Sequence, residues 1–310
     1  MSLLREEVCR MITVVGSINI DLVVKTDEIP KIGETLLGNE FLQIPGGKGA
    51  NQGVTIAKLK EEITFLGKVG NDNYGDILLT SMRDAGVNIE HIEKVEGGTG
   101  IAVINVDKEG RNNITVIPGA NKAVDQDYIM RNKEAIEKAE LVLFQLEIPI
   151  ETVRSGLKLA KELGKVTVLN PAPAQELDDE MIKNIDILIP NEYELERISK
   201  VKVSTEESIL TASKVLLDKG VEKLIVTLGS QGVLYIDHKG HEFYKAYKVN
   251  AVDTTGAGDS FIGGFVASYV KDGNIEAAIE IGQKVAALSV QKVGAQSSFP
   301  TLKEVENFKA

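Results

Sequence analysis

The fold is decided by residues 141–169, which read LVLFQLEIPIETVRSGLKLAKELGKVTVL. A short apolar run at each end of this stretch encloses a helix-like pattern over 151–163. Further apolar runs follow at 187–189 and 224–228, again with helical patterns between them. Nearly continuous apolar strands that alternate with helices are typical of a parallel sheet covered on both faces. The sequence therefore predicts a three-layer α/β/α fold with a mostly parallel central sheet.

The first half of the chain contains strands of another kind. Their side chains alternate between apolar and polar, which makes them poor partners for a parallel core. These strand-like segments are 20–25, 34–43, 101–106 and 114–117. We expect them to form a small separate β-sheet over one edge of the domain, a lid with segments near 20–43 and 100–117.

Residues 11–310 are expected to form one domain, with the lid inserted in its first half. A strand-like run opens at Met11, so residues 1–10 are interpreted as an N-terminal extension without assigned function. Two helices, predicted at 258–270 and 274–291, close the domain.

Composition excludes several classes of function. The 310 residues are 43% hydrophobic, and 35 basic against 46 acidic side chains give a formal charge of −11. A dedicated nucleic-acid or anionic-membrane binder needs clustered Lys and Arg, so neither class is expected. No run approaches the roughly 18 apolar residues of a membrane span. Cys9 is the only cysteine, which excludes an intramolecular disulfide and favours a cytoplasmic location.

Polar residues follow several of the apolar runs, where open α/β sheets bind their ligands. They include Glu147, Asn170, Asn191 with Glu194, and the stretch 229–232. Each of these taken alone is more simply explained as a turn or a helix cap. Their shared position at the ends of parallel strands favours a common cleft.

The most specific stretch is Asp253-Thr254-Thr255-Gly256-Ala257-Gly258-Asp259, directly before an apolar helix. Small residues at a helix N-terminus leave backbone N–H groups open to a phosphoryl group, and the helix dipole adds positive potential. Asp259 can then accept a proton from an attacking alcohol while the amides stabilise the transferred group. The alternative is close helix packing with an aspartate cap.

Two common nucleotide-binding motifs are absent. No G-x-x-x-x-G-K-[ST] sequence occurs, which excludes a Walker-type P-loop. A dinucleotide fingerprint begun at Gly256 and Gly258 would need glycine where Phe261 stands.

A second glycine cluster, Gly46-Gly47-Lys48-Gly49-Ala50-Asn51, leads into another helical pattern. Glycine permits close approach of the backbone to a ligand, and Lys48 and Asn51 offer donors for sugar hydroxyls. A flexible turn before a helix explains the cluster equally well. Upstream, Asn19 and Asp21 point to one face of an extended run, where they can bind vicinal hydroxyls or simply end a strand.

These motifs, in this order, resemble those of the ribokinase family of sugar kinases. The opening Val14-Val15-Gly16-Ser17-Ile18-Asn19-Ile20-Asp21 is similar to the start of ribokinases, and 46–52 and 253–261 resemble the two family signatures. Asn191-Glu192-Tyr193-Glu194 resembles the family's N-x-x-E motif. The resemblance extends from about Met11 to the C-terminus.

The resemblance implies an ATP-dependent phosphorylation of a sugar, with Asp259 as catalytic base and Gly256, Ala257 and Gly258 as anion hole. The implied sugar ligands are Asn19, Asp21, Gly47, Lys48, Gly49, Asn51, Glu147 and Asp259. The implied ATP contacts are Asn191, Glu194, Thr227, Gly229, Ser230, Gly232, Gly258 and Gln283. Relatives vary at the position of Gln283 and often carry alanine at the position of Gly256.

The family also implies cations and a dimer. Glu194 would organise water around Mg²⁺. A monovalent cation, usually K⁺, would be held by Asp253, Thr255, Ser289, Lys292, Gly294 and Ser298, several of them through main-chain oxygens. Lid sheets in ribokinases pair, which implies a homodimer through the lid.

Lys48 between glycines favours ribose, phosphorylated at its 5-hydroxyl, over fructose or a nucleoside. A kinase of deoxyribose or another small sugar would retain the same catalytic residues. A non-catalytic sugar or nucleotide sensor on the same fold is the alternative from another class, although a sensor need not retain Asp259.

Overall fold

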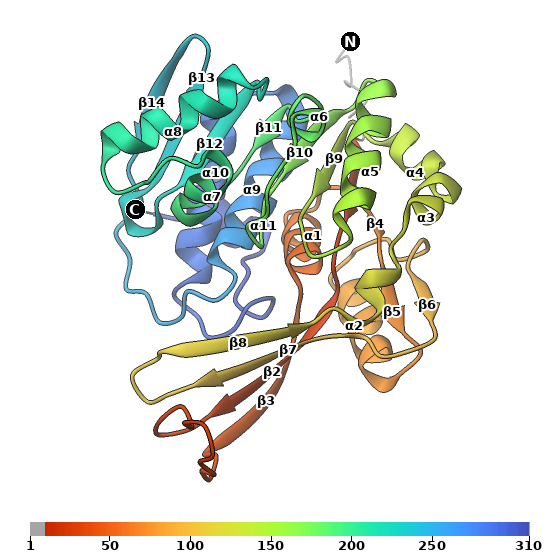
Figure 1. Ribbon diagram of the computed structural model, residues 1–310, viewed down its shortest axis with the longest axis vertical. Helices are drawn as coiled ribbons and strands as arrows, with labels where there is room; N and C mark the ends of the chain where they lie inside the picture. The colour runs from red at the N-terminus through yellow and green to blue at the C-terminus, as the bar shows by residue number, and fades with distance from the viewer. Residues whose placement is uncertain (1–9, 310) are drawn as a thin grey trace, which may run out of the picture.

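A mostly parallel sheet forms the middle layer of the protein in the computed structural model, which describes residues 10–309 (Figure 1). Its strand order is β14 (Gly240–Tyr244), β13 (Val233–Asp237), β12 (Lys223–Thr227), β11 (Ile187–Leu188), β10 (Val166–Leu169), β9 (Leu141–Phe144), β1 (Ile12–Val15) and β4 (Ile63–Leu66). Strands β4, β1, β9, β10, β11 and β12 run parallel, and β13 and β14 add an antiparallel hairpin at one edge. The predicted fold class is confirmed. Cys9 and most of the predicted extension lie outside the described residues.

Helices cover both faces of this sheet because its buried strands send alternate side chains to opposite sides. Val14 and Leu143 pack into one apolar cluster, whereas Val15 and Phe144 pack into the other. The first cluster is covered by α1 (Lys48–Lys58), α2 (Asn73–Asp84), α9 (Ala257–Asp272) and α10 (Ile275–Ser289). The second is covered by α3 (Gln126–Arg131), α4 (Lys133–Lys138), α5 (Ile150–Glu162), α6 (Asp179–Ile182), α7 (Glu192–Ser199) and α8 (Glu206–Asp218). Helix α11 (Leu302–Glu306) packs near the C-terminus.

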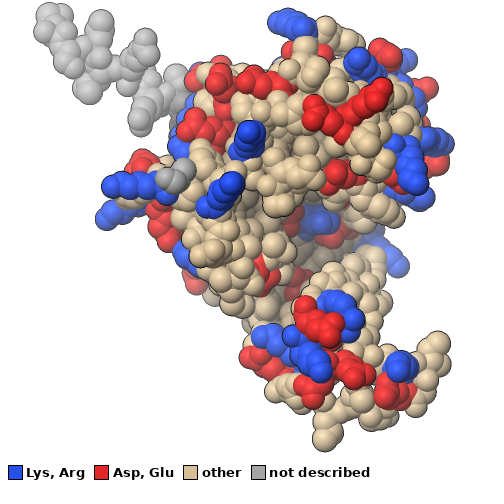
Figure 2. Space-filling view, turned by 90° about the vertical axis from the view of Figure 1, so that its left-hand side faces the viewer, with Lys and Arg blue, Asp and Glu red and all other residues tan. Residues whose placement is uncertain are grey.

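A second sheet projects from this body (Figure 1). We call it the projecting sheet; its order is β3 (Glu40–Gly46), β2 (Asn19–Lys25), β7 (Gly100–Val106) and β8 (Asn112–Ile117). Figure 2 shows it set apart from the body, with acidic and basic side chains interspersed on the visible face. The projecting sheet starts directly after β1 and returns directly into α1, so it is joined to the body at the carboxyl edge of the central sheet.

One predicted strand is wrong in its first half. Residues 34–39 are not in a strand, and β3 runs from Glu40 to Gly46 instead of over 34–43. Strand β2 has seven residues and pairs antiparallel with β3, with Lys25 opposite Glu40 and Asn19 opposite Gly46. Because β2 ends at Lys25, β3 can begin no earlier than its partner Glu40. The alternating pattern upstream of Glu40 therefore has no strand to pair with.

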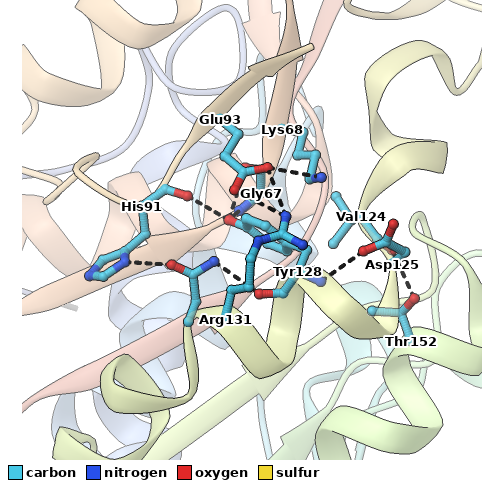
Figure 3. A network of polar contacts seen from close by, with 10 residues as sticks. Gly67, Lys68, His91, Glu93, Val124, Asp125, Tyr128, Arg131 and Thr152 are labelled. Carbon is cyan, nitrogen blue, oxygen red and sulfur yellow. Dashed lines mark hydrogen bonds and ion pairs between the residues drawn. The ribbon is translucent and has the colours of Figure 1, made fainter.

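A polar network around Tyr128 of α3 joins this helix to residues 67–93 (Figure 3). The Tyr128 hydroxyl lies 2.6 Å from the carbonyl oxygen of His91 and accepts a hydrogen bond from Gly67 N. The Lys68 ammonium lies 4.7 Å from the centre of the Tyr128 ring and forms an ion pair with Glu93. This network ties α3 to the small parallel pair β5 (Lys68–Gly70) and β6 (Glu93–Val95). It thereby supports the short 3₁₀ helix Gly119–Ala123, which precedes α3.

Within residues 10–309, no helix combines the length and apolar character needed to cross a bilayer.

Candidate active site

Helices α1 and α9 pack closely, and their N-termini meet at the carboxyl edge of the central sheet. A Cβ on Gly263 of α9 would lie 2.5 Å from Thr55 Cβ of α1, so only glycine permits this approach. At the N-terminal ends, Asn51 Nδ2 donates a hydrogen bond of 2.9 Å to Asp259 Oδ2. The two glycine-rich stretches predicted to bind ligands therefore form one site.

The start of α1 is packed against the end of β1. Gly47 has a φ of 88°, and a Cβ on Gly49 would lie 2.7 Å from Ser17 N. The Lys48 amide donates to Glu147 Oε2 at 3.0 Å, and the Ser17 hydroxyl donates to the same oxygen. A carboxylate of the chain itself thus occupies this positive helix end.

Charged groups from four parts of the chain surround Lys48. Burial, with help from the nearby Glu147 and Asp259 carboxylates, raises the pKa of Asp21 to about 7. Burial alone would lower the pKa of Lys48, but the surrounding carboxylates outweigh it and raise that pKa. Burial also raises the pKa of Glu194. The cluster holds a charged ammonium among carboxylates that are costly to ionise together.

Asn19 is fixed by Asn121, a residue that sequence reasoning missed. Asn121 Nδ2 donates to Asn19 Oδ1 at 2.7 Å, and Asn121 Oδ1 accepts from Ile18 N at 2.9 Å. Both asparagine side chains are buried. Asn121 belongs to no motif; its only signal is its place after Gly119, where the chain leaves β8.

Asp259 is the third residue of α9 and is almost fully buried. Besides Asn51, it accepts a hydrogen bond from Gln52 Nε2, at 3.0 Å to Oδ1. Gly256 has a φ of 74°, which bends the chain into the helix. The amide of Ala257, predicted for the anion hole, donates to Thr254 O at 3.1 Å. A Cβ on Gly258 would meet no atom within 4 Å, so this part of the backbone faces open space.

Two adjoining cavities lie on this side of α9. The larger, about 620 Å³, is lined by seven of the predicted ATP residues: Asn191, Thr227, Gly229, Ser230, Gly232, Gly258 and Gln283. The smaller, about 230 Å³, is lined by Lys48, Asn170, Glu194 and Asp259 among others. Gly258 and Ala257 line both cavities. Of the predicted sugar residues, Lys48 and Asp259 reach the smaller cavity, and Asn19, Asp21, Gly47, Gly49, Asn51 and Glu147 do not line it.

The larger cavity also has an apolar wall that sequence reasoning missed. It includes Tyr193, Tyr247, Val249, Phe261 and Val290. These residues come from separate loops and helices, so no local motif marks them. Gln283, predicted near adenine, donates to Tyr244 O at 3.1 Å.

The N-x-x-E motif forms a reciprocal helix cap. Asn191 Oδ1 accepts from Glu194 N at 2.8 Å, and Glu194 Oε2 accepts from Asn191 N at 2.9 Å. This is the simpler explanation offered for such residues, a capping box at the start of α7. Both side chains still line the smaller cavity, so cap and ligand contact are compatible.

Only part of the predicted cation set is in mutual contact. Asp253 accepts from the amide and hydroxyl of Thr255 and from Gly294 N at 2.9 Å. Lys292 N donates to Ser289 O, whereas the Lys292 ammonium pairs with Glu304. The buried Ser298 hydroxyl donates to Ala295 O. Burial opposes ionisation of Asp253, but these donors outweigh it and lower the pKa. No cluster of three or more His, Cys, Asp or Glu suited to a metal occurs within 10–309.

Comparisons with known proteins agree over nearly the whole chain. A family model described as pfkB family carbohydrate kinase matches residues 10–302. The chain is 40% identical to a ribokinase of Haemophilus influenzae over 301 residues, 96% of this chain and 98% of the relative. It is also 40% identical to a deoxyribokinase of Salmonella typhi over 299 residues, 96% and 98% of the two chains. The structure of Arabidopsis thaliana ribokinase complexed with ribose and ATP is similar, with a TM-score of 0.92, 32% identity and coverage of 97% of this chain and 100% of that one.

Proposed function

The chain belongs to the pfkB family of carbohydrate kinases, and we propose that it uses ATP to phosphorylate D-ribose at the 5-hydroxyl, which yields ribose 5-phosphate and ADP. The observation that carries this proposal is the junction of the two cavities. Asp259 lines the smaller cavity, and the open backbone at Gly258 borders both. A hydroxyl beside Asp259 would therefore face a nucleotide phosphate in the larger cavity.

In the proposed reaction the sugar lies between the projecting sheet and the body. Asn19, Asp21, Lys48, Asn51 and Glu147 would bind its hydroxyls, with the backbone of Gly47 and Gly49 beside them. The 5-oxygen attacks the γ-phosphorus, the bond from that phosphorus to the bridging oxygen of ADP breaks, and the hydroxyl proton passes to Asp259. The N–H groups at Gly256–Gly258 and the charged Lys48 would stabilise the transferred phosphoryl group. The Ala257 N–H, which donates to Thr254 O without ligand, would exchange that bond for one to the phosphoryl group.

The position of the Asp259 carboxylate is expected to contribute more to the rate of phosphoryl transfer than its basicity does. An alcohol is a weak acid and a carboxylate is a weak base, so proton transfer accompanies phosphoryl transfer rather than preceding it. The two hydrogen bonds from Asn51 and Gln52 hold the Asp259 carboxylate in one orientation. A fixed carboxylate beside a bound hydroxyl supplies the alignment that such a reaction needs.

ATP fits the larger cavity by size and by lining. An apolar wall beside small residues suits an adenine ring, and about 620 Å³ lies within the usual range of ligand pockets. Glu194 would organise water around Mg²⁺, which neutralises phosphate charge when bound. A hard cation such as K⁺ prefers oxygen ligands, and its proposed ligands are Asp253, Thr255, Ser289, Lys292, Gly294 and Ser298, several of them through main-chain oxygens. We also propose that the enzyme works in the cytoplasm.

We further propose that the projecting sheet is a lid that closes over the sugar. It is joined to the body at Asn19, Gly46 and Gly100, next to the proposed sugar ligands. Hydrogen exchange of residues 20–43 and 100–117 should slow when ribose is added. Unchanged exchange at saturating ribose would contradict closure.

The same sheet is proposed to pair with that of a second copy. Phe41, Ile114, Val116 and Ile117 expose apolar side chains on β3 and β8. Exposed apolar side chains on a sheet are often covered by a partner. Sedimentation equilibrium should give the mass of a dimer, and charged substitutions at Ile114 and Val116 should shift it toward the monomer. A monomeric wild type at high concentration would contradict this proposal.

Deoxyribose is the second candidate, because deoxyribokinases are as similar to the chain as ribokinases are. A coupled ADP-release assay with ribose, deoxyribose, fructose and adenosine separates these substrates. We expect the highest kcat/KM for ribose. Turnover of ribose no better than that of fructose would remove the ribose assignment, and ribose binding without turnover would favour a sensor.

A further inference from the structure

A buried set of side-chain amides surrounds Asp259 and extends in two directions. From Oδ1 it runs to Gln52, whose Oε1 accepts from Gln145 Nε2 at 2.7 Å. From Oδ2 it runs to Asn51, whose Oδ1 accepts from Gln296 Nε2 at 3.1 Å. All four amide residues are buried.

The orientation of these amides follows from the charge of Asp259. An ionised carboxylate only accepts hydrogen bonds, so Asn51 must turn its NH₂ group toward it and its oxygen away. The oxygen of Asn51 then requires a donor on its far side. Gln296 supplies that donor, and the buried pair Asn51–Gln296 is complete only in this orientation.

The only hydrogen bond of the Gln296 side chain within residues 10–309 is the one to Asn51. Its own Oε1 is buried and has no hydrogen-bond partner within residues 10–309. A buried unpaired acceptor is unfavourable, so a methionine of similar length would avoid that cost if only packing mattered. The retained group is the N–H donor that faces Asn51.

The backbone around Gln296 is anchored at several points. Lys58 Nζ donates to Gln296 O at 2.6 Å and to Phe299 O at 3.0 Å. Atoms of Phe299 and Ala295 lie 3.0 and 3.3 Å from a Cβ built on Gly256. The segment 294–299 thus packs against the start of α9 and the end of α1, which fixes where the Gln296 amide points.

We propose that Gln296 is a positioning residue for the catalytic base, acting through Asn51. Its N–H donor fixes the Asn51 amide so that Asn51 presents NH₂, and not oxygen, to Asp259. Without that donor the buried oxygen of Asn51 has no partner, so the Asn51 side chain is held less firmly and its NH₂ group can move together with the Asp259 carboxylate away from the sugar hydroxyl. This inference rests on the proposed function of Asp259.

The test is a double-mutant cycle on turnover. Gln296→Met removes the donor at similar length, and Gln296→Glu replaces it with an acceptor of nearly the same shape. Each is made alone and together with Asn51→Ala, and kcat, the KM values for ribose and ATP, and Tm are measured. Ser297→Ala is the matched control, since Ser297 lies in the same segment but is exposed and bonds only Val293 O.

We expect Gln296→Met to lower kcat about tenfold with the KM for ATP unchanged, because a small misplacement of a catalytic group is costly. Gln296→Glu should lower kcat further. In the Asn51→Ala background, Gln296→Met should change kcat less than about twofold, because the path to Asp259 is already broken.

If the kcat loss of the double variant equals the product of the two single losses, Gln296 and Asn51 act independently, which indicates a general packing role and overturns the proposal. An unchanged kcat in both Gln296→Met and Gln296→Glu would overturn it as well. If Gln296→Met does not fold, Gln296→Leu, which also removes the donor without burying a charge, carries the cycle. A wild type without sugar turnover would instead contradict the proposed function, and Ser297→Ala should match the wild type throughout.

Discussion

The two glycine-rich helix starts have similar sequences but opposite surroundings. At α1, the amides of Lys48 and Gly49 already donate to Glu147 and to the Ser17 hydroxyl. At α9, the backbone at Gly258 faces open space beside two cavities. Each start carries the positive potential of a helix N-terminus, but at α1 the amides of Lys48 and Gly49 are already used, so only the second start is open to a phosphoryl group.

This difference separates two uses of glycine. Gly47 and Gly49 allow the backbone of α1 to lie against Ser17 and Asn19, where a Cβ would be 2.7 Å from a backbone nitrogen in both cases. Gly258 has no such neighbour, so its missing side chain leaves room for something that is not protein. The α1 start is built for packing, and the α9 start is built for access.

The largest effect on turnover is predicted at the N-terminus of α9. Asp259→Asn should reduce turnover by at least about a hundredfold while ribose binding is largely kept, because an amide cannot accept the proton. The amide also offers one oxygen where Asn51 and Gln52 now donate to two. A coupled ADP-release assay and calorimetry measure the two effects.

The control for this substitution is Asp272→Asn, at the exposed C-terminal end of the same helix. It should leave turnover unchanged. Equal turnover in Asp259→Asn and wild type would exclude Asp259 as the base.

A matched pair of alanine substitutions tests the comparison directly. Gly49→Ala should lower the free energy of unfolding by about 1–3 kcal/mol, because its Cβ would overlap Ser17 N. Gly258→Ala should fold with near-normal stability but lose phosphoryl transfer, because its Cβ enters the space between the cavities. Urea unfolding and steady-state kinetics distinguish the two. Equal destabilisation by both substitutions would remove the distinction between the helix starts.

The difference between the N-termini of α1 and α9 could not be predicted from the sequence. Apolar runs such as 141–144 predict buried parallel strands because no other element needs an uninterrupted apolar segment of that length. Glycine runs carry no comparable information, since close packing and ligand access both require a missing side chain. The motif at Asp253–Asp259 predicted a carboxylate at a helix start, and the structure has Asp259 there.

The residues that orient the site side chains, Gln296 and Asn121, could not be predicted from the sequence for another reason. Gln296 and Asn51 are 245 positions apart, and Asn121 and Asn19 are 102 apart. Such partners meet only after the sheet and both helices have packed. Their side chains are ordinary amides, which local pattern cannot tell from surface residues.

A smaller effect is predicted for the carboxylate at the α1 start. Glu147→Gln should lower the free energy of unfolding by about 1 kcal/mol, because it removes the negative charge that receives Lys48 N. It should also weaken ribose binding. Glu162→Gln, at the exposed C-terminal end of α5, is the control and should show neither loss. Full stability of Glu147→Gln would mean that the α1 start does not depend on that charge.

The last prediction is a pH-dependent difference at Asp21. Burial and neighbouring carboxylates raise its pKa from 3.8 to about 7 in the folded protein. Between these pH values the folded state binds more protons than the unfolded state, so this group makes the wild type less stable as the pH rises. Asp21→Asn removes that contribution. The Tm of Asp21→Asn minus that of wild type, without ligand, should therefore increase from about pH 4 to pH 8.

The control is Asp127→Asn in the exposed first turn of α3, for which the difference should stay nearly constant. A flat difference for Asp21→Asn would mean that Lys48 compensates the Asp21 charge fully in the absence of sugar. The acidic surroundings of the α1 start would then be balanced before any ligand binds. A rising difference would instead show that the filled helix start has an unrelieved negative charge beside it. Sugar hydroxyls that donate to Asp21 would stabilise its charged form. At saturating ribose, the Tm of Asp21→Asn minus that of wild type should therefore rise less between about pH 4 and pH 8 than it does without ligand.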